Sequence, residues 1–414
     1  MQKIIIPKPY EFIAPHRGTW WPTIIQRLRL YDIYLKRTQG IASCEIRHGE
    51  RFAASLRAGH GILLTPNHAR PADPVVLGWL ARPYRTHLYA MASWHLFNQD
   101  RFTSWAIHKM GGFSVNREAV DRRAIDTAIQ ILSTAERPLL LFPEGAVSRT
   151  NDRLNGLLDG VSFIARNAAR QRQKRGDGGQ VVVHPVAIKY RFRGNLPQVL
   201  EPSLRAIEDR FAWRPQTDRP LLERIRRIGF SLLTLKELEY LGRPQTGTLQ
   251  ERLQSLINHL LHPIEEEWCG GPQEGPVVPR IKGIRMKMLP DLIQGGLASN
   301  EERRRWNQLA DLYLAQQVAS YPPDYLTDPP SIDRLLETVE RYEEDLTDGT
   351  RIRGQLHAII QVGEAIPVAA ERLRNSPTDP LMRQIEETLR GMLDTLATES
   401  PEWTDERATC DKHS

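Results

Sequence analysis

The stretch Thr65-Pro-Asn-His-Ala-Arg-Pro-Ala-Asp-Pro74 joins an apolar run to a helical pattern. Residues 61–65 (Gly-Ile-Leu-Leu-Thr) predict a short buried strand, and residues 75–80 (Val-Val-Leu-Gly-Trp-Leu) predict a helix. The corner between them carries His68 and Asp73. Loops at strand ends in α/β proteins expose side chains on a rigid base, so we expect the chemistry of the protein at this corner.

His68 and Asp73 form a pair that suits proton transfer. A neutral imidazole can take a proton from a hydroxyl at one nitrogen. A carboxylate at the other nitrogen would fix the tautomer and stabilise the imidazolium. On these residues alone a structural interpretation stays open, because Asp73 followed by Pro74 is also a good helix start and His68 can be a hydrogen-bonded, half-buried side chain.

Length and composition set the broad class. The 414 residues suffice for two or three domains, or for one domain with a large insertion. Hydrophobic residues make up 40% and charged residues 26%, as in soluble globular proteins. The net charge of +6 is compatible with anionic membrane surfaces or phosphate-bearing substrates. Cys44, Cys269 and Cys410 form no metal-binding pattern and suit a reducing compartment.

Membrane contact is expected to be peripheral. No apolar run is long enough to span a bilayer and no signal peptide is visible, so we expect a cytoplasmic protein. In the N-terminal segment, residues 1–40, Trp20-Trp21-Pro22 precede a helical pattern over residues 23–37. Its apolar face carries Ile24, Leu28, Tyr31 and Leu35. Paired tryptophans beside a basic amphipathic helix are typical of an interfacial membrane anchor, and an ordinary core-packing helix is the alternative.

Residues 41–193 alternate strand and helix patterns. Strands are expected at residues 87–93, 138–142 and 181–188, and helices at residues 102–110, 118–134 and 157–174. Such alternation predicts a mostly parallel sheet flanked by helices.

The rest of the chain has a different character. Residues 194–354 are rich in Leu, Arg and Glu and predict a helical region without recognisable chemistry or internal repeat. A strand pattern returns at residues 356–362 and a helix at residues 380–397. Residues 400–414 are expected to be a disordered tail.

Four sequence blocks follow one another in order. They are Asn67-His68 with Asp73, Gly111-Gly-Phe-Ser-Val-Asn-Arg117, Phe142-Pro-Glu-Gly145 and Val183-His-Pro-Val-Ala187. This set resembles the glycerolipid acyltransferase superfamily, typified by the 1-acyl-sn-glycerol-3-phosphate (lysophosphatidate) acyltransferases. The resemblance covers roughly residues 40–192. It implies an α/β acyltransferase domain with a large helical insertion at residues 194–354, closed by the strand and helix of residues 355–399.

The resemblance also implies a reaction. A fatty acyl group would move from a thioester, on coenzyme A or acyl carrier protein, to a free hydroxyl of a lysophosphatidate-type acceptor. His68 would be the general base and Asp73 its orienting partner, with no cofactor and no metal. Arg117 is the first candidate for the acceptor phosphate and Arg149 the second, because a guanidinium binds phosphate oxygens in a forked geometry. The other substrate-binding candidates are Asn67, Gly112, Asn116, Glu144, Gly145 and Ser148. An anionic membrane surface is an expected partner and nucleic acid is not.

The chain departs from the family pattern at two places. The third block usually continues Thr-Arg-Ser, whereas Ala146-Val-Ser148 stands here. A Lys that often precedes the Gly corresponding to Gly160 is also absent. Glycerol-3-phosphate, another lysophospholipid and a non-phosphate alcohol therefore stay open as acceptors. A non-enzymatic lipid-binding protein is the alternative from a different class.

Overall fold

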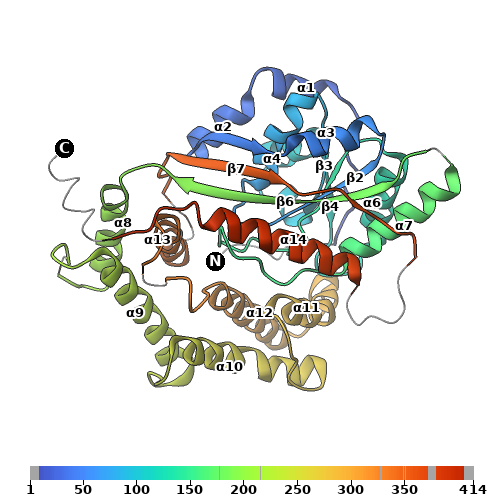
Figure 1. The fold of residues 1–414 in the computed structure, drawn as a ribbon. Coiled ribbons are helices and arrows are strands. Elements are labelled where there is room, and N and C mark those ends of the chain that lie inside the picture. Colours follow the sequence, from blue (N-terminus) through green and yellow to red (C-terminus); the bar gives the residue numbers. More distant parts are fainter. Residues whose placement is uncertain are drawn as a thin grey trace.

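The computed structural model describes residues 9–176, 178–214, 216–326, 329–347, 349, 351–371 and 379–404. Its strands are β1 (Ile41–Arg47), β2 (Gly61–Pro66), β3 (Tyr89–Ser93), β4 (Gly112–Val115), β5 (Leu139–Leu140), β6 (Val181–Phe192), β7 (Leu356–Val362) and β8 (Ile366–Pro367). They form one eight-stranded sheet in the order β1-β7-β6-β2-β5-β3-β4, with β8 paired to β6. Only the pairs that β6 makes with β7 and β8 are antiparallel among these strands. The predicted mostly parallel α/β fold is confirmed (Figure 1).

Helices cover the sheet and extend beyond it. Those of the first half are α1 (Trp20–Arg27), α2 (Leu30–Thr38), α3 (Gly49–Arg57), α4 (Asp73–Ala81), α5 (Arg101–Lys109), α6 (Arg122–Thr134) and α7 (Gly160–Arg175). Those of the second half are α8 (Leu196–Arg210), α9 (Leu221–Leu241), α10 (Leu249–Cys269), α11 (Val277–Gln294), α12 (Ser299–Ala319), α13 (Ile332–Thr347) and α14 (Pro380–Ala397). In Figure 1, α9 to α12 form a helical layer below the sheet, and α8 and α13 lie between this layer and the left end of the sheet.

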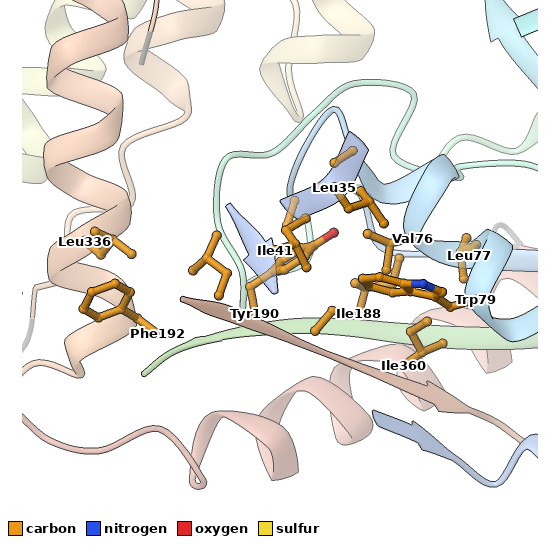
Figure 2. Packing of buried hydrophobic residues seen from close by; sticks show 14 of the residues in the cluster. Leu35, Ile41, Val76, Leu77, Trp79, Ile188, Tyr190, Phe192, Leu336 and Ile360 are labelled. Atoms are coloured by element: carbon orange, nitrogen blue, oxygen red, sulfur yellow. The ribbon is translucent and has the colours of Figure 1, made fainter. Parts of the chain in front are cut away.

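The central strands are buried on both faces, which explains their continuous apolar runs. Because side chains alternate along a strand, Ile62 and Leu64 of β2 join one core and Leu63 joins the other. The first core also receives Leu336 of α13, which lies beside Phe192 of β6 (Figure 2). Helix α13 is thereby attached to the sheet, although it follows β6 by well over a hundred residues.

Strand β7 returns to the sheet after the helical region. It lies between β1 and β6, with Ile360 opposite Ile188 of β6. The division predicted from the sequence, with residues 194–354 inserted in one domain, stays a prediction, and this pairing is the observation in its favour.

The N-terminal helical segment differs in detail from its prediction. The expected single helix breaks at Arg29, which has a left-handed backbone (φ 52°), so α1 and α2 are separate helices. Leu28, before the break, is exposed, whereas Tyr31 and Leu35, after it, are buried. The single apolar face predicted for Ile24, Leu28, Tyr31 and Leu35 is therefore wrong.

The first residues of the expected disordered tail contact the rest of the chain. Trp403 is 5% exposed and its backbone N–H donates to the carbonyl of Pro330 at 2.8 Å. The hydroxyl of Ser400 donates to Asp333 of α13 at 2.6 Å. The expectation of disorder from residue 400 is wrong for residues 400–404, and residues 405–414 lie outside the described residues.

The helical region contains a recurring arrangement that corrects the expectation of no repeat. Glu208, Glu237 and Glu265, near the ends of α8, α9 and α10, each accept a backbone N–H from a residue eight positions farther along. Each also pairs with an arginine of the next helix, at 2.9, 2.7 and 2.8 Å; these arginines are Arg224, Arg252 and Arg280. Each of these glutamates therefore stabilises the loop that follows its helix and links two consecutive helices.

Candidate active site

Three of the four sequence blocks meet at one edge of the sheet because β2, β3, β4 and β5 run in the same direction, and the fourth lies within β6. His68 follows β2, Phe142 follows β5, and Arg117 follows β4. All three side chains line one cavity of about 2110 Å³. The carboxyl edge of a parallel sheet is where α/β proteins bind ligands.

His68 and Asp73 are in direct contact. The Nδ1 atom of His68 lies 2.9 Å from an oxygen of Asp73, which is fully buried. An ionised carboxylate only accepts hydrogen bonds, so the proton resides on Nδ1 and Nε2 is left as the acceptor. Asp73 also accepts the backbone N–H of Arg70 at 2.9 Å and the hydroxyl of Tyr190. The N-cap position of α4 belongs to Ala72, so the carboxylate holds the corner instead of capping the helix.

Phe142 and Tyr190 complete the surroundings of the pair. The ring of His68 stacks on that of Phe142, with centroids 3.9 Å apart and planes 24° apart. Burial and the charge of Asp73 raise the pKa of Tyr190 well above its ordinary value, so this phenol stays a hydrogen-bond donor. Sequence reasoning missed Tyr190, whose position near the end of a long buried strand gives no signal by itself.

Glu144 fixes the backbone of the corner. One oxygen accepts the N–H of His68 at 2.7 Å and the other accepts the N–H of Asn155 at 3.0 Å. Burial raises the pKa of Glu144, and the two backbone N–H donors oppose that shift. Its carboxylate therefore positions the loop, while Glu144 also lines the cavity, and its expected contact with substrate stays a prediction.

Asn67 and Ser148 lie in the interior rather than on the cavity wall. The amide of Asn67 exchanges two hydrogen bonds with the backbone of Ile188 in β6, at 2.7 and 3.0 Å. The backbone N–H of Ser148 donates to the carbonyl of His68 at 2.7 Å. Neither side chain lines the cavity and both hold the loops, so the expected substrate contact of Asn67 and Ser148 stays a prediction.

Gly112, Gly145 and Asn116 do line the cavity. Gly145 has φ of 69°, and a Cβ there would lie 2.5 Å from a methyl carbon of Leu158. A Cβ on Gly112 would meet Ile107 at 2.5 Å, so packing alone requires this glycine.

The two predicted phosphate-binding arginines differ in their partners. The guanidinium of Arg117 donates to the carbonyl of Gly145, and burial lowers the pKa of Arg117. Arg149 forms an ion pair with Glu344 of α13. Its charge is compensated inside the protein, whereas Arg117 forms no ion pair with the part of the chain that the structure describes.

Comparison with known proteins identifies this part of the chain. Residues 47–189 match the family model described as Acyltransferase. They form an acyltransferase-family domain. A stretch of 107 residues is 33% identical to a protein named 1-acyl-sn-glycerol-3-phosphate acyltransferase from Streptococcus pneumoniae (strain ATCC BAA-255 / R6). That match spans 26% of this chain and 37% of the relative's length.

Helix α13 contacts two loops of the candidate site, those that carry Arg70 and Arg149. Arg70, two residues after His68, pairs with Glu340 of α13 at 2.6 Å. Arg341 of α13 donates to the carbonyl of Arg149 at 2.6 Å. The sequence predicted no chemistry in this helix, and charged residues on an amphipathic helix give no sign that they will be buried.

The free energy of unfolding should depend on pH through Glu337 of α13. Burial raises the pKa of Glu337 to about 7. The unfolded chain loses this proton near pH 4.5 but the folded chain keeps it to about pH 7, so the residue's contribution to stability is present below pH 4.5 and is lost as pH rises through 7. We expect Glu337→Gln to leave the free energy of unfolding unchanged at pH 4.5 and to raise it by roughly 3 kcal/mol at pH 8. Urea unfolding of both proteins at the two pH values measures this, and an equal difference at both would contradict it.

An exposed apolar patch borders the cavity. Trp20 of α1 is 64% exposed and Phe102 of α5 is 74% exposed. The rings of Trp20, Trp21, Trp105 and Phe102 follow one another with centroids 4.6, 5.0 and 6.0 Å apart. Trp21, Phe102 and Trp105 also line the cavity. Within the described residues, no helix has both the length and the apolar character needed to cross a membrane.

We predict that this patch binds membranes. The double substitution Trp20→Ser and Phe102→Ser should weaken flotation with anionic liposomes by about ten-fold or more, because each large apolar side chain contributes roughly 1.5–3 kcal/mol when buried. Phe230→Ser on α9, where the side chain is 45% exposed, is the matched control and should float like the unmodified chain. Equal flotation of all three proteins would show that the patch does not contribute to membrane binding.

Proposed function

We propose that the protein transfers a fatty acyl group from acyl-CoA or acyl carrier protein to the free hydroxyl of a lysophosphatidate-type acceptor in phospholipid biosynthesis. The observation that carries this proposal is the contact of His68 with Asp73 at 2.9 Å on the wall of the large cavity. The family of residues 47–189 and the name of the similar streptococcal protein agree with it.

The chemistry follows from the two side chains. The acceptor hydroxyl gives its proton to Nε2 of His68 while its oxygen attacks the thioester carbonyl carbon. Asp73 stabilises the imidazolium that forms. When the tetrahedral intermediate collapses, the carbon–sulfur bond breaks and the thiolate takes the proton. The ester is made in this way without a cofactor and without an acyl-enzyme.

The cavity has room and chemistry for two substrates. Its volume of about 2110 Å³ exceeds the roughly 300–1,000 Å³ of a pocket for one small molecule. Ile24, Tyr31 and Met110 give it an apolar part suited to an acyl chain, and Arg117 gives it a cationic part suited to a phosphate. The apolar patch at its border suits a lipid that enters from a membrane surface.

Glycerol-3-phosphate, another lysophospholipid and a non-phosphate alcohol are the alternative acceptors for the same chemistry. A non-enzymatic lipid-binding protein would have no need for a buried carboxylate that orients an imidazole in a cavity, so this alternative ranks last.

Product analysis tests the proposal. Purified protein is given long-chain acyl-CoA with lysophosphatidate, glycerol-3-phosphate, a lysophospholipid with a larger headgroup, or monoacylglycerol. The proposal expects the diacyl product to form fastest with lysophosphatidate. Preference for monoacylglycerol would favour the non-phosphate alcohol, and no product with any acceptor would overturn acyl transfer.

A further inference from the structure

Helix α11 of the helical region contributes a buried cation to the cavity. Arg285 is 6% exposed and lines the same cavity as Arg117 and His68. Its Nε atom is buried and has no hydrogen-bond partner among the described residues. Its ion-pair partner, Glu118, lies 3.7 Å away, too far for a hydrogen bond.

Neighbouring arginines of the helical region show how a structural guanidinium is satisfied here. Arg280, on the same helix, makes two hydrogen bonds of 2.8 and 2.9 Å with the buried Glu265. Arg305 of α12 contacts Glu301 at 2.7 Å and Asp291 at 3.0 Å. Removing a guanidinium from water is expensive unless close acceptors replace the lost hydration. Arg285 has undergone the same burial without such acceptors.

Arg117 also forms no ion pair with the described residues. Its half-buried guanidinium lines the same cavity and donates to the carbonyl of Gly145. Burial lowers the pKa of Arg117 and the nearby charge of Arg285 lowers it further, although Glu118 opposes the shift. Two like charges that face one cavity repel each other, and an anion between them would remove that repulsion.

We propose that Arg285 and Arg117 together bind a phosphate group of the substrate, so that the helical region supplies part of the acceptor site. The inference rests on the proposed acyl transfer for the identity of the substrate. Guanidiniums bind phosphate oxygens through forked, charge-assisted hydrogen bonds. Arg149, already paired with Glu344, is not needed for this site.

The acceptor is the favoured source of the phosphate. In lysophosphatidate the phosphate and the reacting hydroxyl sit on neighbouring parts of one glycerol unit, so the phosphate must bind close to His68. Arg117 meets this requirement because it donates to Gly145, three residues after Phe142, whose ring stacks on the His68 ring. The phosphates of coenzyme A or of acyl carrier protein have the same chemistry, and the experiment separates the two sources.

Kinetics of Arg285→Met and Arg285→Lys provide the test. Methionine keeps much of the side-chain length without the charge, and Lys287→Met on the exposed face of α11 is the matched control. We expect Arg285→Met to raise the KM for lysophosphatidate about ten- to a hundred-fold and to leave that for acyl-CoA unchanged. Arg285→Lys should recover part of the loss, monoacylglycerol should show no effect, and the control should match the unmodified chain.

Three other results would overturn the phosphate site or its assignment to the acceptor. A raised KM for acyl-CoA, but not for an acyl thioester of N-acetylcysteamine, would keep the phosphate site and overturn its assignment to the acceptor. Unchanged KM values for both phosphate-bearing substrates would overturn the site. Without phosphate, Arg285→Met should melt no lower than the unmodified chain, because it removes a poorly compensated charge. A large drop in melting temperature would show that Arg285 is structural.

Failure of the acyl-transfer proposal is recognised separately. If the unmodified protein makes no acyl product, calorimetric titration with glycerol-3-phosphate still tests the cation pair. Binding that is lost in Arg285→Met and kept in Lys287→Met would support the phosphate site, and equal binding by both would overturn it.

Discussion

His68→Ala should lower the rate of acyl transfer by about two to four orders of magnitude, the usual cost of losing a general base. The side chain of His68 is 15% exposed and stacks on Phe142, so its removal leaves a small space at the cavity wall. Steady-state turnover with acyl-CoA and lysophosphatidate measures the loss. The melting temperature serves as the control and should fall by only a few degrees.

Retention of more than about a tenth of the turnover would exclude His68 as the base. A large fall in both turnover and melting temperature would leave the role unresolved for alanine, so His68→Gln is the companion variant. Glutamine retains a hydrogen-bonding partner for Asp73 but cannot take up a proton. We expect it to be as inactive as the alanine variant.

Asp73→Asn should cost about two to four orders of magnitude as well. An amide at this position can donate to Nδ1 of His68, and the proton then moves to Nε2, which loses its ability to accept the proton of the hydroxyl. The Nδ1 of His68 and the backbone N–H of Arg70 both contact Oδ2 of Asp73, so an amide nitrogen at that position loses one hydrogen bond, the 2.9 Å bond from Arg70. Activity should therefore fall far more than stability.

Tyr190→Phe should reduce activity less than Asp73→Asn does. It removes one hydrogen bond to Asp73 and leaves the contact with His68 in place. We expect a loss of about ten-fold, since a hydrogen bond to a charged group contributes on the order of 1.5–3 kcal/mol. A Tyr190→Phe loss as large as that of Asp73→Asn would mean that the carboxylate has lost its position, and the tautomer argument would then lack support.

The sheet and the pair at its edge were predictable because local patterns determine them. The apolar run of residues 61–65 is β2, and the corner after it brings His68 and Asp73 together as the spacing suggested. The break at Arg29 was not predictable, because a left-handed backbone at a non-glycine residue leaves no mark in the helical period.

Contacts between segments far apart in the sequence could not be predicted from local sequence patterns. Arg70 and Glu340 lie 270 positions apart, and nothing in either neighbourhood marks the other as its partner. Nothing in the sequence around Arg285 predicts its burial, and only the fold shows that it is buried. The recurring loops of the helical region did carry a signal, since Pro-Gln stands at residues 215–216, 244–245 and 272–273.

The most direct test of direct acyl transfer is to follow thiol release and lipid product together. With acyl-CoA alone the account predicts no thiol release beyond the uncatalysed background and no acyl adduct in the intact mass of the protein. Addition of lysophosphatidate should start the release of free coenzyme A in amounts equal to the phosphatidate formed, and His68→Ala should abolish both. Thiol release without an acceptor, or an acylated protein, would contradict the account.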